Sequence, residues 1–142
     1  MIIMLVEKTN IKTYIPQREP FIMIDSLIDA NETGFSSLFF INNNNIFIEN
    51  NILSEAAIIE NIAQTCAAGF GYLSSLEDES KPRLGFIGAI TKLEVFNEIK
   101  TNVMIETHVS IINTFENIHL IEGIARSSNI DILKCQMKIV LS

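Results

Sequence analysis

The stretch that decides the fold is SEAAIIENIAQTCAAGFGYL, residues Ser54 to Leu73. Ser54 is a suitable N-cap, and Glu55 places an acid in the first turn, where the helix dipole favours negative charge. Apolar residues recur at intervals of three and four, which is typical of one buried helix face; they are Ile59, Ile62, Ala63, Cys66, Phe70 and Leu73. The sequence therefore predicts one long, buried central helix.

Glu60 is the residue of this helix that most needs an explanation. It lies beside the apolar face, and Gln64, Ala67 and Gly71 continue its stripe along the helix. Burying a carboxylate among apolar and small residues is unfavourable unless the carboxylate has a partner. Glu60 is therefore either a functional acid, or a carboxylate that binds buried backbone donors or faces solvent at a subunit interface.

Two strands are predicted before the helix. Residues 21–28 (FIMIDSLI) are apolar and then alternate around Asp25, and residues 35–41 form the returning strand after a turn at residues 31–34. The first 15 residues fit either a strand or a short helix. The asparagines that follow the second strand begin a loop that continues to Asn51, because asparagine disfavours the interior of helices and strands.

Four more strands are predicted after the helix, beyond a polar loop at residues 74–82. Gly85 and Gly88 in the first of them allow a bulge or a close backbone approach. The four ranges are residues 84–96, 103–111, 118–125 and 130–141. One helix and this much sheet can bury their apolar faces when an antiparallel sheet wraps around the helix, so we expect an α+β fold.

Length and composition narrow the class of protein. A chain of 142 residues is most simply one domain, spanning residues 1–142, and its net charge of −7 with no basic run argues against a nucleic-acid surface. No stretch approaches the roughly 20 apolar residues of a membrane span, and the opening MIIMLVEK lacks the features of a signal peptide. We therefore expect a soluble, cytoplasmic protein. Cys66 and Cys135 lie in apolar patterns without metal-ligand spacing, which favours core packing.

Three motifs in order give the chain a family resemblance. They are IPQREPFIMID (residues 15–25), IIENIAQ (residues 58–64) and GFIGAI (residues 85–90). The chain resembles the hotdog-fold (3R)-hydroxyacyl-acyl-carrier-protein dehydratases, which show LPHRxPFLLVD, (I/L)EAxAQ and an F(A/L)GI-type strand at similar spacing. It is most similar to a divergent branch from aryl-polyene and flexirubin-type pigment gene clusters. The implied fold is the hotdog, an antiparallel sheet wrapped around one long central helix.

The chain departs from that family at the catalytic histidine. Conventional members carry HFPG shortly before the helix, and an ungapped count back from Glu60 places Ile46 at the histidine position. His108 and His119 lie in later predicted strands, where an exposed or simply hydrogen-bonded role is favoured. Gln17 stands where the first motif usually has a histidine that is not the catalytic one.

The resemblance implies roles for particular residues. Dehydration of a 3-hydroxyacyl thioester needs a base for the proton beside the carbonyl and an acid for the departing hydroxyl. By resemblance Glu60 is the acid, Gln64 orients it, and the backbone around Gly88 lines or polarises the acyl site together with the position of Ile46. Arg18 is expected to be a structural ion-pair residue or to face the carrier. The run of small residues after Gln64 suits either close packing on the sheet or a slot for an acyl chain.

Three functions remain open at this stage. The first is an acyl-carrier dehydratase or half-site, in which Glu60 works with a histidine donated by a partner chain or with a water-mediated base. The second is a non-catalytic partner of a conventional dehydratase, and the third is a hotdog thioesterase whose helix carboxylate activates water. The implied partners are an acyl carrier protein bearing acyl-phosphopantetheine and, in a homodimer or heterodimer, a second hotdog chain. Fatty-acid or polyene-pigment synthesis is the implied setting, and neither metal nor organic cofactor is implied.

Overall fold

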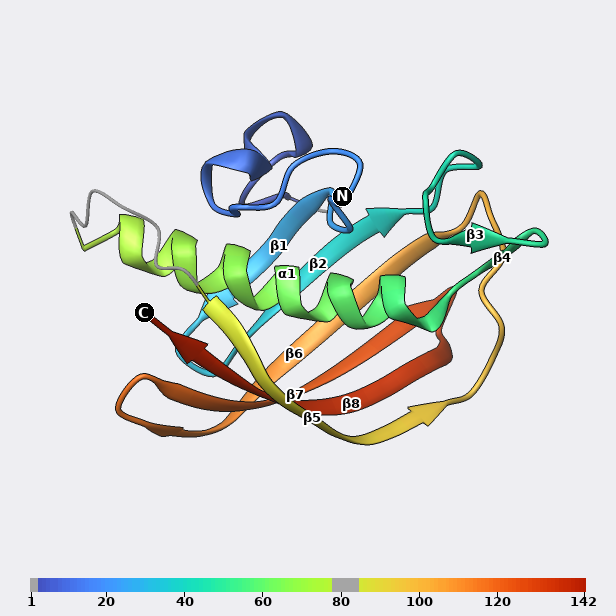
Figure 1. Cartoon of the computed structure of the whole chain (residues 1–142). Coiled ribbons are helices and arrows are strands. Elements are labelled where there is room, and N and C mark those ends of the chain that lie inside the picture. The colour runs from blue at the N-terminus through green and yellow to red at the C-terminus, as the bar shows by residue number, and fades with distance from the viewer. Residues whose placement is uncertain (1–2, 78–84) are drawn as a thin grey trace.

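The computed structural model describes residues 3–77 and 85–142 (Figure 1). Within these residues a six-stranded sheet, one long helix and a two-stranded hairpin make up the regular structure, with a short 3-10 helix near the N-terminus. In chain order the elements are η1 (Lys8–Thr13), β1 (Ser26–Asn31), β2 (Gly34–Phe40), β3 (Ile48–Glu49), β4 (Ile52–Leu53), α1 (Glu55–Ser75), β5 (Gly85–Val95), β6 (Met104–Phe115), β7 (Ile118–Ser127) and β8 (Ile130–Leu141).

The sheet is antiparallel throughout, in the order β1-β2-β6-β7-β8-β5. Figure 1 shows the sheet curving beneath α1, so that the helix lies along its concave face. The main core is the layer between them, where large side chains from both elements are fully buried, among them Phe35, Ile58, Ile62, Ile105 and Met137. The predicted α+β arrangement of a sheet around one helix is confirmed.

Helix α1 begins where the sequence predicts. The Ser54 side chain accepts a hydrogen bond from the Ala56 N–H at 3.2 Å, and the helix ends at Ser75, two residues later than expected. Its most buried face differs from the prediction. Ile62 and Cys66 are buried as expected, but the other predicted face residues are only partly buried, whereas Asn61 and Thr65 are fully buried.

The close approach of helix α1 to the sheet explains why its most buried face differs from the predicted one. A Cβ atom on Gly69 would lie 2.2 Å from the Phe35 ring, and one on Gly123 of β7 would lie 2.5 Å from Ile62. Small residues at these contacts let the helix settle deep into the curved sheet, so that more than one apolar stripe becomes buried. Close packing by the small residues of the helix is therefore confirmed at Gly69.

The predicted strand at residues 21–28 is wrong in its start, because β1 begins only at Ser26. The Met23 N–H donates to the Gln64 side chain at 2.7 Å, and the Met23 carbonyl accepts from Asn61 at 2.7 Å. Side chains of the helix thus occupy backbone groups that a strand would give to a neighbouring strand. Periodicity cannot reveal such a contact across the fold.

The remaining predictions for loops and termini hold in part. Near the N-terminus the short-helix alternative occurs, as the 3-10 helix η1. The described residues before it form no strand and pair only through an isolated bridge between Val6 and Leu27. The asparagine-rich loop contains the unpredicted β3–β4 hairpin, whose turn has Asn50 and Asn51 at φ of 54° and 63°. The predicted loop at residues 74–82 begins with the end of α1, and residues 78–82 lie outside the described residues, as does residue 84 of the next predicted strand.

The last four strands appear in the predicted order. β6 and β7 extend a few residues beyond their expected ends, and β8 has the predicted bounds. Gly88 is the extra residue of a bulge between Ile87 and Ala89 of β5, as anticipated for a glycine in that strand. Cys66 and Cys135 are buried free thiols in the core, and burial raises the pKa of both, that of Cys135 to about 11.

Candidate active site

A cleft of about 250 Å³ contains Glu60 at one side of α1. Its walls come from the segment after η1, from the helix, from the first residues of β5 and from the end of β8. The lining residues are Pro16, Gln17, Glu60, Ala63, Ala67, Gly85, Phe86, Ile87, Ile139 and Leu141. Most are apolar or small, so Ala63 and Ala67 contribute to a slot, while Gly69 serves the packing on the sheet.

Gln64, one helical turn further along α1, holds the Glu60 carboxylate in place. The carboxylate is half-buried, and its Oε1 accepts a hydrogen bond of 2.8 Å from the Gln64 side-chain amide. Gln64 is completely buried, donates also to the Phe21 carbonyl at 2.9 Å, and accepts from the Met23 N–H at 2.7 Å. A glutamine bound at three points has little rotational freedom, so it fixes the position of one carboxylate oxygen.

A second polar cluster, which the sequence did not predict, lies on the inner side of the same helix. Asn61 accepts from the Thr107 hydroxyl at 2.5 Å, and Thr65 donates to the Asn61 carbonyl at 2.8 Å while its hydroxyl lies 2.7 Å from that of Ser37. All four residues are fully buried. We call Ser37, Asn61, Thr65 and Thr107 the inner polar cluster. One signal was available, because Asn61 and Thr65 are polar residues spaced by one helical turn.

Two of the predicted site residues lie apart from Glu60. Gly88 is exposed on β5, just beyond the cleft residue Ile87. Ile46 is half-exposed and lines a different cleft, of about 370 Å³, together with η1 residues and Asp25. Within one chain, therefore, the structure brings Glu60 and Gln64 together but not Ile46 or Gly88.

Both histidines lie elsewhere, and each has partners. His108 is on the outer face of the sheet, where its Nδ1 lies 2.8 Å from the Ser36 hydroxyl. The Nδ1 of His119 lies 2.9 Å from the Thr114 hydroxyl, and its ring packs on Phe70 with a centroid distance of 4.5 Å. Among the residues that the structure describes, Glu60 is the one ionisable side chain lining its cleft.

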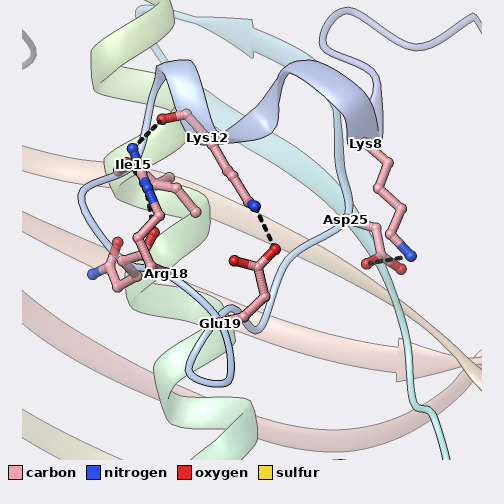
Figure 2. A network of polar contacts seen from close by, with 7 residues as sticks. Lys8, Lys12, Ile15, Arg18, Glu19 and Asp25 are labelled. Carbon is pink, nitrogen blue, oxygen red and sulfur yellow. Dashed lines mark hydrogen bonds and ion pairs between the residues drawn. The ribbon is translucent and has the colours of Figure 1, made fainter.

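The larger of these two clefts contains a carboxyl group whose pKa is raised, that of Asp25. Asp25 accepts a hydrogen bond from the Phe40 N–H at 2.7 Å. The Lys8 ammonium lies 3.8 Å from the same carboxylate, and Figure 2 shows this ion pair. Burial raises the pKa of Asp25 above its usual value, and the backbone hydrogen bond and Lys8 oppose that rise.

In the described part of the chain no three His, Cys, Asp or Glu side chains group as metal ligands, and no helix is long and apolar enough to cross a membrane.

Comparison with known families decides the relationship. The profile of the ApeP-like family, described as ApeP dehydratase, matches residues 9–118. The chain belongs to the ApeP-like dehydratase family. The matched range includes Gln17, Glu60, Gln64 and all of β5. The predicted membership in a divergent, dehydratase-like branch of aryl-polyene clusters is thereby confirmed. No curated protein matches the chain.

Solved structures agree with this assignment at the level of the fold. A chain of "The Dehydratase Heterocomplex ApeI:P from Xenorhabdus doucetiae" matches with a TM-score of 0.85 and 12% identity, over 93% of this chain and 90% of that one. PH1136 from Pyrococcus horikoshii matches at 0.70 and 8% identity, over 92% of each chain. A hypothetical thioesterase from Streptococcus pneumoniae, solved with coenzyme A, matches at 0.66 and 5% identity, over 82% and 84%. The ApeP-like chain therefore has the predicted hotdog fold.

Proposed function

We propose that this ApeP-like chain is one half of a dehydratase for carrier-bound 3-hydroxyacyl thioesters, with Glu60 as its acid. The observation that carries the proposal is a half-buried carboxylate, fixed by a fully buried glutamine, in a cleft with mainly apolar walls. An apolar slot suits an acyl chain, and a fixed carboxylate at its wall suits a reacting hydroxyl.

The chemistry requires two groups. A base removes the proton from the carbon beside the thioester carbonyl, the acid protonates the 3-hydroxyl, and water leaves as the double bond forms. Glu60 serves as the acid that protonates the hydroxyl. Because Glu60 is the one ionisable side chain among the described residues of the cleft, the base comes from a second chain.

Strand β5 offers the surface for that second chain. It is an 11-residue edge strand beside β8, and its apolar residues Phe86, Ile87, Ile90, Leu93 and Val95 are between 40% and 55% exposed. An edge with unpaired backbone groups and exposed apolar side chains favours pairing with another strand. Phe86 and Ile87 also line the Glu60 cleft, so a chain bound at β5 would lie beside Glu60.

We propose a conventional, histidine-bearing hotdog dehydratase as this partner. The structure from Xenorhabdus doucetiae is a dehydratase heterocomplex, and its similarity to this chain supports a heterodimer here. In such a dimer the partner's catalytic histidine would lie beside Glu60 and supply the base, because this chain has Ile46 where conventional members have the histidine. Backbone N–H groups at the Gly88 bulge are candidates for polarising the thioester carbonyl. The substrate would arrive on the phosphopantetheine arm of an acyl carrier protein, during synthesis of a fatty acid or polyene pigment.

The test is to assay this chain alone, its hotdog partner alone, and their mixture on a 3-hydroxyacyl carrier protein. The mixture is expected to form enoyl product, and Glu60→Gln in this chain is expected to reduce its rate by about 10²–10⁴-fold. A mixture whose rate Glu60→Gln leaves unchanged would show that Glu60 is not the acid. Release of free acid instead of enoyl product would identify a thioesterase.

A second candidate is a non-catalytic subunit that stabilises the conventional dehydratase. The absence of a second ionisable group among the described residues of the cleft favours it. On this view Glu60→Gln leaves the rate of the mixture intact, whereas removing this chain lowers the amount of folded, active partner.

A further inference from the structure

The Glu60 cleft contains a second polar side chain whose oxygen has no partner. Gln17 lines the cleft, and its Oε1 atom is buried without a hydrogen bond. In the described part of the chain it is the one buried side-chain nitrogen or oxygen atom left in this state. Burying an acceptor without a donor is unfavourable, so such an atom is either a defect of packing or a group that binds a donor from a ligand.

The backbone on both sides of Gln17 is firmly held, which argues against a packing defect. The Arg18 guanidinium donates to the carbonyls of Gln17 at 2.7 Å and Ile15 at 2.8 Å, and more weakly to that of Lys12 at 3.3 Å. Lys12 forms an ion pair with Glu19 at 2.5 Å, as Figure 2 shows. Among the described residues Arg18 does not form the expected ion pair, and it holds the loop through hydrogen bonds to carbonyls. Hydrogen bonds to its backbone carbonyls hold the loop in place, so the Gln17 side chain is not needed for this and can bind a ligand in the cleft.

Two polar side chains line the cleft, and each has an oxygen without a donor from the described residues. Glu60 receives one hydrogen bond from the described residues, at Oε1 from Gln64, so its other oxygen is left for the ligand and carries the proton when Glu60 acts as the acid. Gln17 adds a neutral amide oxygen in the same cleft. The surrounding walls are Ala, Ile, Leu, Phe, Pro and Gly, whose side chains offer no donor. A ligand that satisfies the Gln17 oxygen must therefore bring an O–H or N–H donor.

We propose that Gln17 is a substrate-binding residue whose Oε1 accepts a hydrogen bond from a donor group of the bound acyl thioester. The inference rests on the proposed function for the class of ligand. Two parts of such a molecule carry the required chemistry, namely the 3-hydroxyl of the acyl chain and the amide N–H groups of the pantetheine arm. A site built to bind such a donor discriminates against an analogue that lacks it, because the acceptor is then left unpaired.

The experiment measures binding rather than turnover, on the complex with the partner chain. The ligands are acyl-pantetheine analogues with an amide in place of the thioester, so that they neither dehydrate nor hydrolyse. One carries a 3-hydroxyl, one lacks it, and one carries the hydroxyl on a shortened arm without the distal amide. The variant is Gln17→Met, which keeps the side-chain length and removes the amide. Gln136→Met is the control, because Gln136 lies on β8 outside the cleft and bonds to Glu122 at 3.3 Å.

The wild-type complex is expected to bind the full hydroxyl ligand about tenfold more tightly than one of the two lacking a donor, and Gln17→Met to abolish that preference. Loss of the preference over the 3-deoxy ligand identifies the hydroxyl as the donor, and loss of the preference over the shortened ligand identifies the pantetheine amide. Gln136→Met is expected to bind as the wild type does.

Unchanged affinities in Gln17→Met would overturn the inference. So would a variant that changes only the dissociation of the two chains, because Gln17 would then bind the partner. Failure of the proposed function looks different: a complex that shows the Gln17-dependent preference without turnover refutes catalysis and keeps the binding role. Normal turnover with no Gln17-dependent preference refutes the binding role of Gln17 and keeps the proposed catalysis.

Discussion

The polar groups on the inner side and on the cleft side of helix α1 differ in whether the chain itself satisfies their hydrogen bonds. On the inner side, the side chains of the inner polar cluster bond to one another and to the Met23 carbonyl. On the cleft side, Glu60 and Gln17 keep acceptors without donors from the described residues. Polar groups that satisfy one another specify the fold, whereas acceptors left open beside an apolar cleft are available to a ligand.

Gln64 connects the two sides. Gln64 and Asn61 both bind the backbone of Met23, because Gln64 accepts from the Met23 N–H and Asn61 donates to the Met23 carbonyl. Gln64 also donates to Glu60. The position of the catalytic candidate therefore depends on the same contacts that hold residues 21–25 against the helix. This coupling can be tested by variants on each side.

The largest effect is expected on the inner side. Asn61→Ala leaves the Met23 carbonyl and the Thr107 hydroxyl without their partner in the core, and should lower the free energy of unfolding by about 2–4 kcal/mol. Glu60→Ala, one residue away at a half-buried position, should lower it by less than about 1 kcal/mol. Urea unfolding followed by circular dichroism measures both. Equal losses would remove the distinction between the two sides.

Thiol reactivity tests how closed the inner side is. Cys66 and Cys135 are buried in the core, and the pKa of Cys135 is raised by burial from 9.0 to about 11. At pH 8 this shift alone reduces the thiolate fraction about a hundredfold. Iodoacetamide should therefore modify neither thiol until denaturant is added, as mass spectrometry would show. Rapid modification of the native protein would mean that the core opens.

A pair of glycine substitutions compares helix packing with the exposed strand. Gly69→Ala places a Cβ 2.2 Å from the buried Phe35 ring, and overpacking of this kind costs about 1–3 kcal/mol. Gly88→Ala meets its nearest neighbours at 3.6 Å, an ordinary contact, and should change stability by no more than about 0.5 kcal/mol. Thermal unfolding of both variants checks the difference. A destabilised Gly88→Ala would show that the β5 bulge itself requires glycine.

The smallest effect is expected at Asp25 and depends on pH. Its raised pKa means that the folded state binds the proton more tightly than the unfolded state, so stability is lost as pH rises from about 3.8 through the folded pKa. Asp25→Asn keeps an oxygen for the Phe40 N–H and removes the buried charge. Relative to the wild type, this variant should be more stable at pH 7 than at pH 3. A stability difference independent of pH would contradict the assigned cause.

Much of the fold was accessible from local pattern. The helix start at Ser54, the succession of six strands along the chain and the bounds of β8 follow from capping and alternation, and glycine chemistry allowed for the bulge at Gly88. Glu60 and Gln64 were recognisable together, because residues four apart lie on one helix face. These features depend on residues close together in the sequence.

What only the tertiary structure decided depends on residues far apart. The inner polar cluster joins β2, α1 and β6, and the unpartnered Gln17 oxygen meets the Glu60 cleft only because a loop near the N-terminus folds against the helix. The late start of β1 has the same origin, since its missing residues bond to helix side chains about 40 positions away. The sequence by itself determined the long helix, the succession of the six sheet strands and the unusual acid of the helix, Glu60. The folded chain decided which polar groups are satisfied, because a hydrogen bond requires a partner in space and its pattern leaves no period in the sequence.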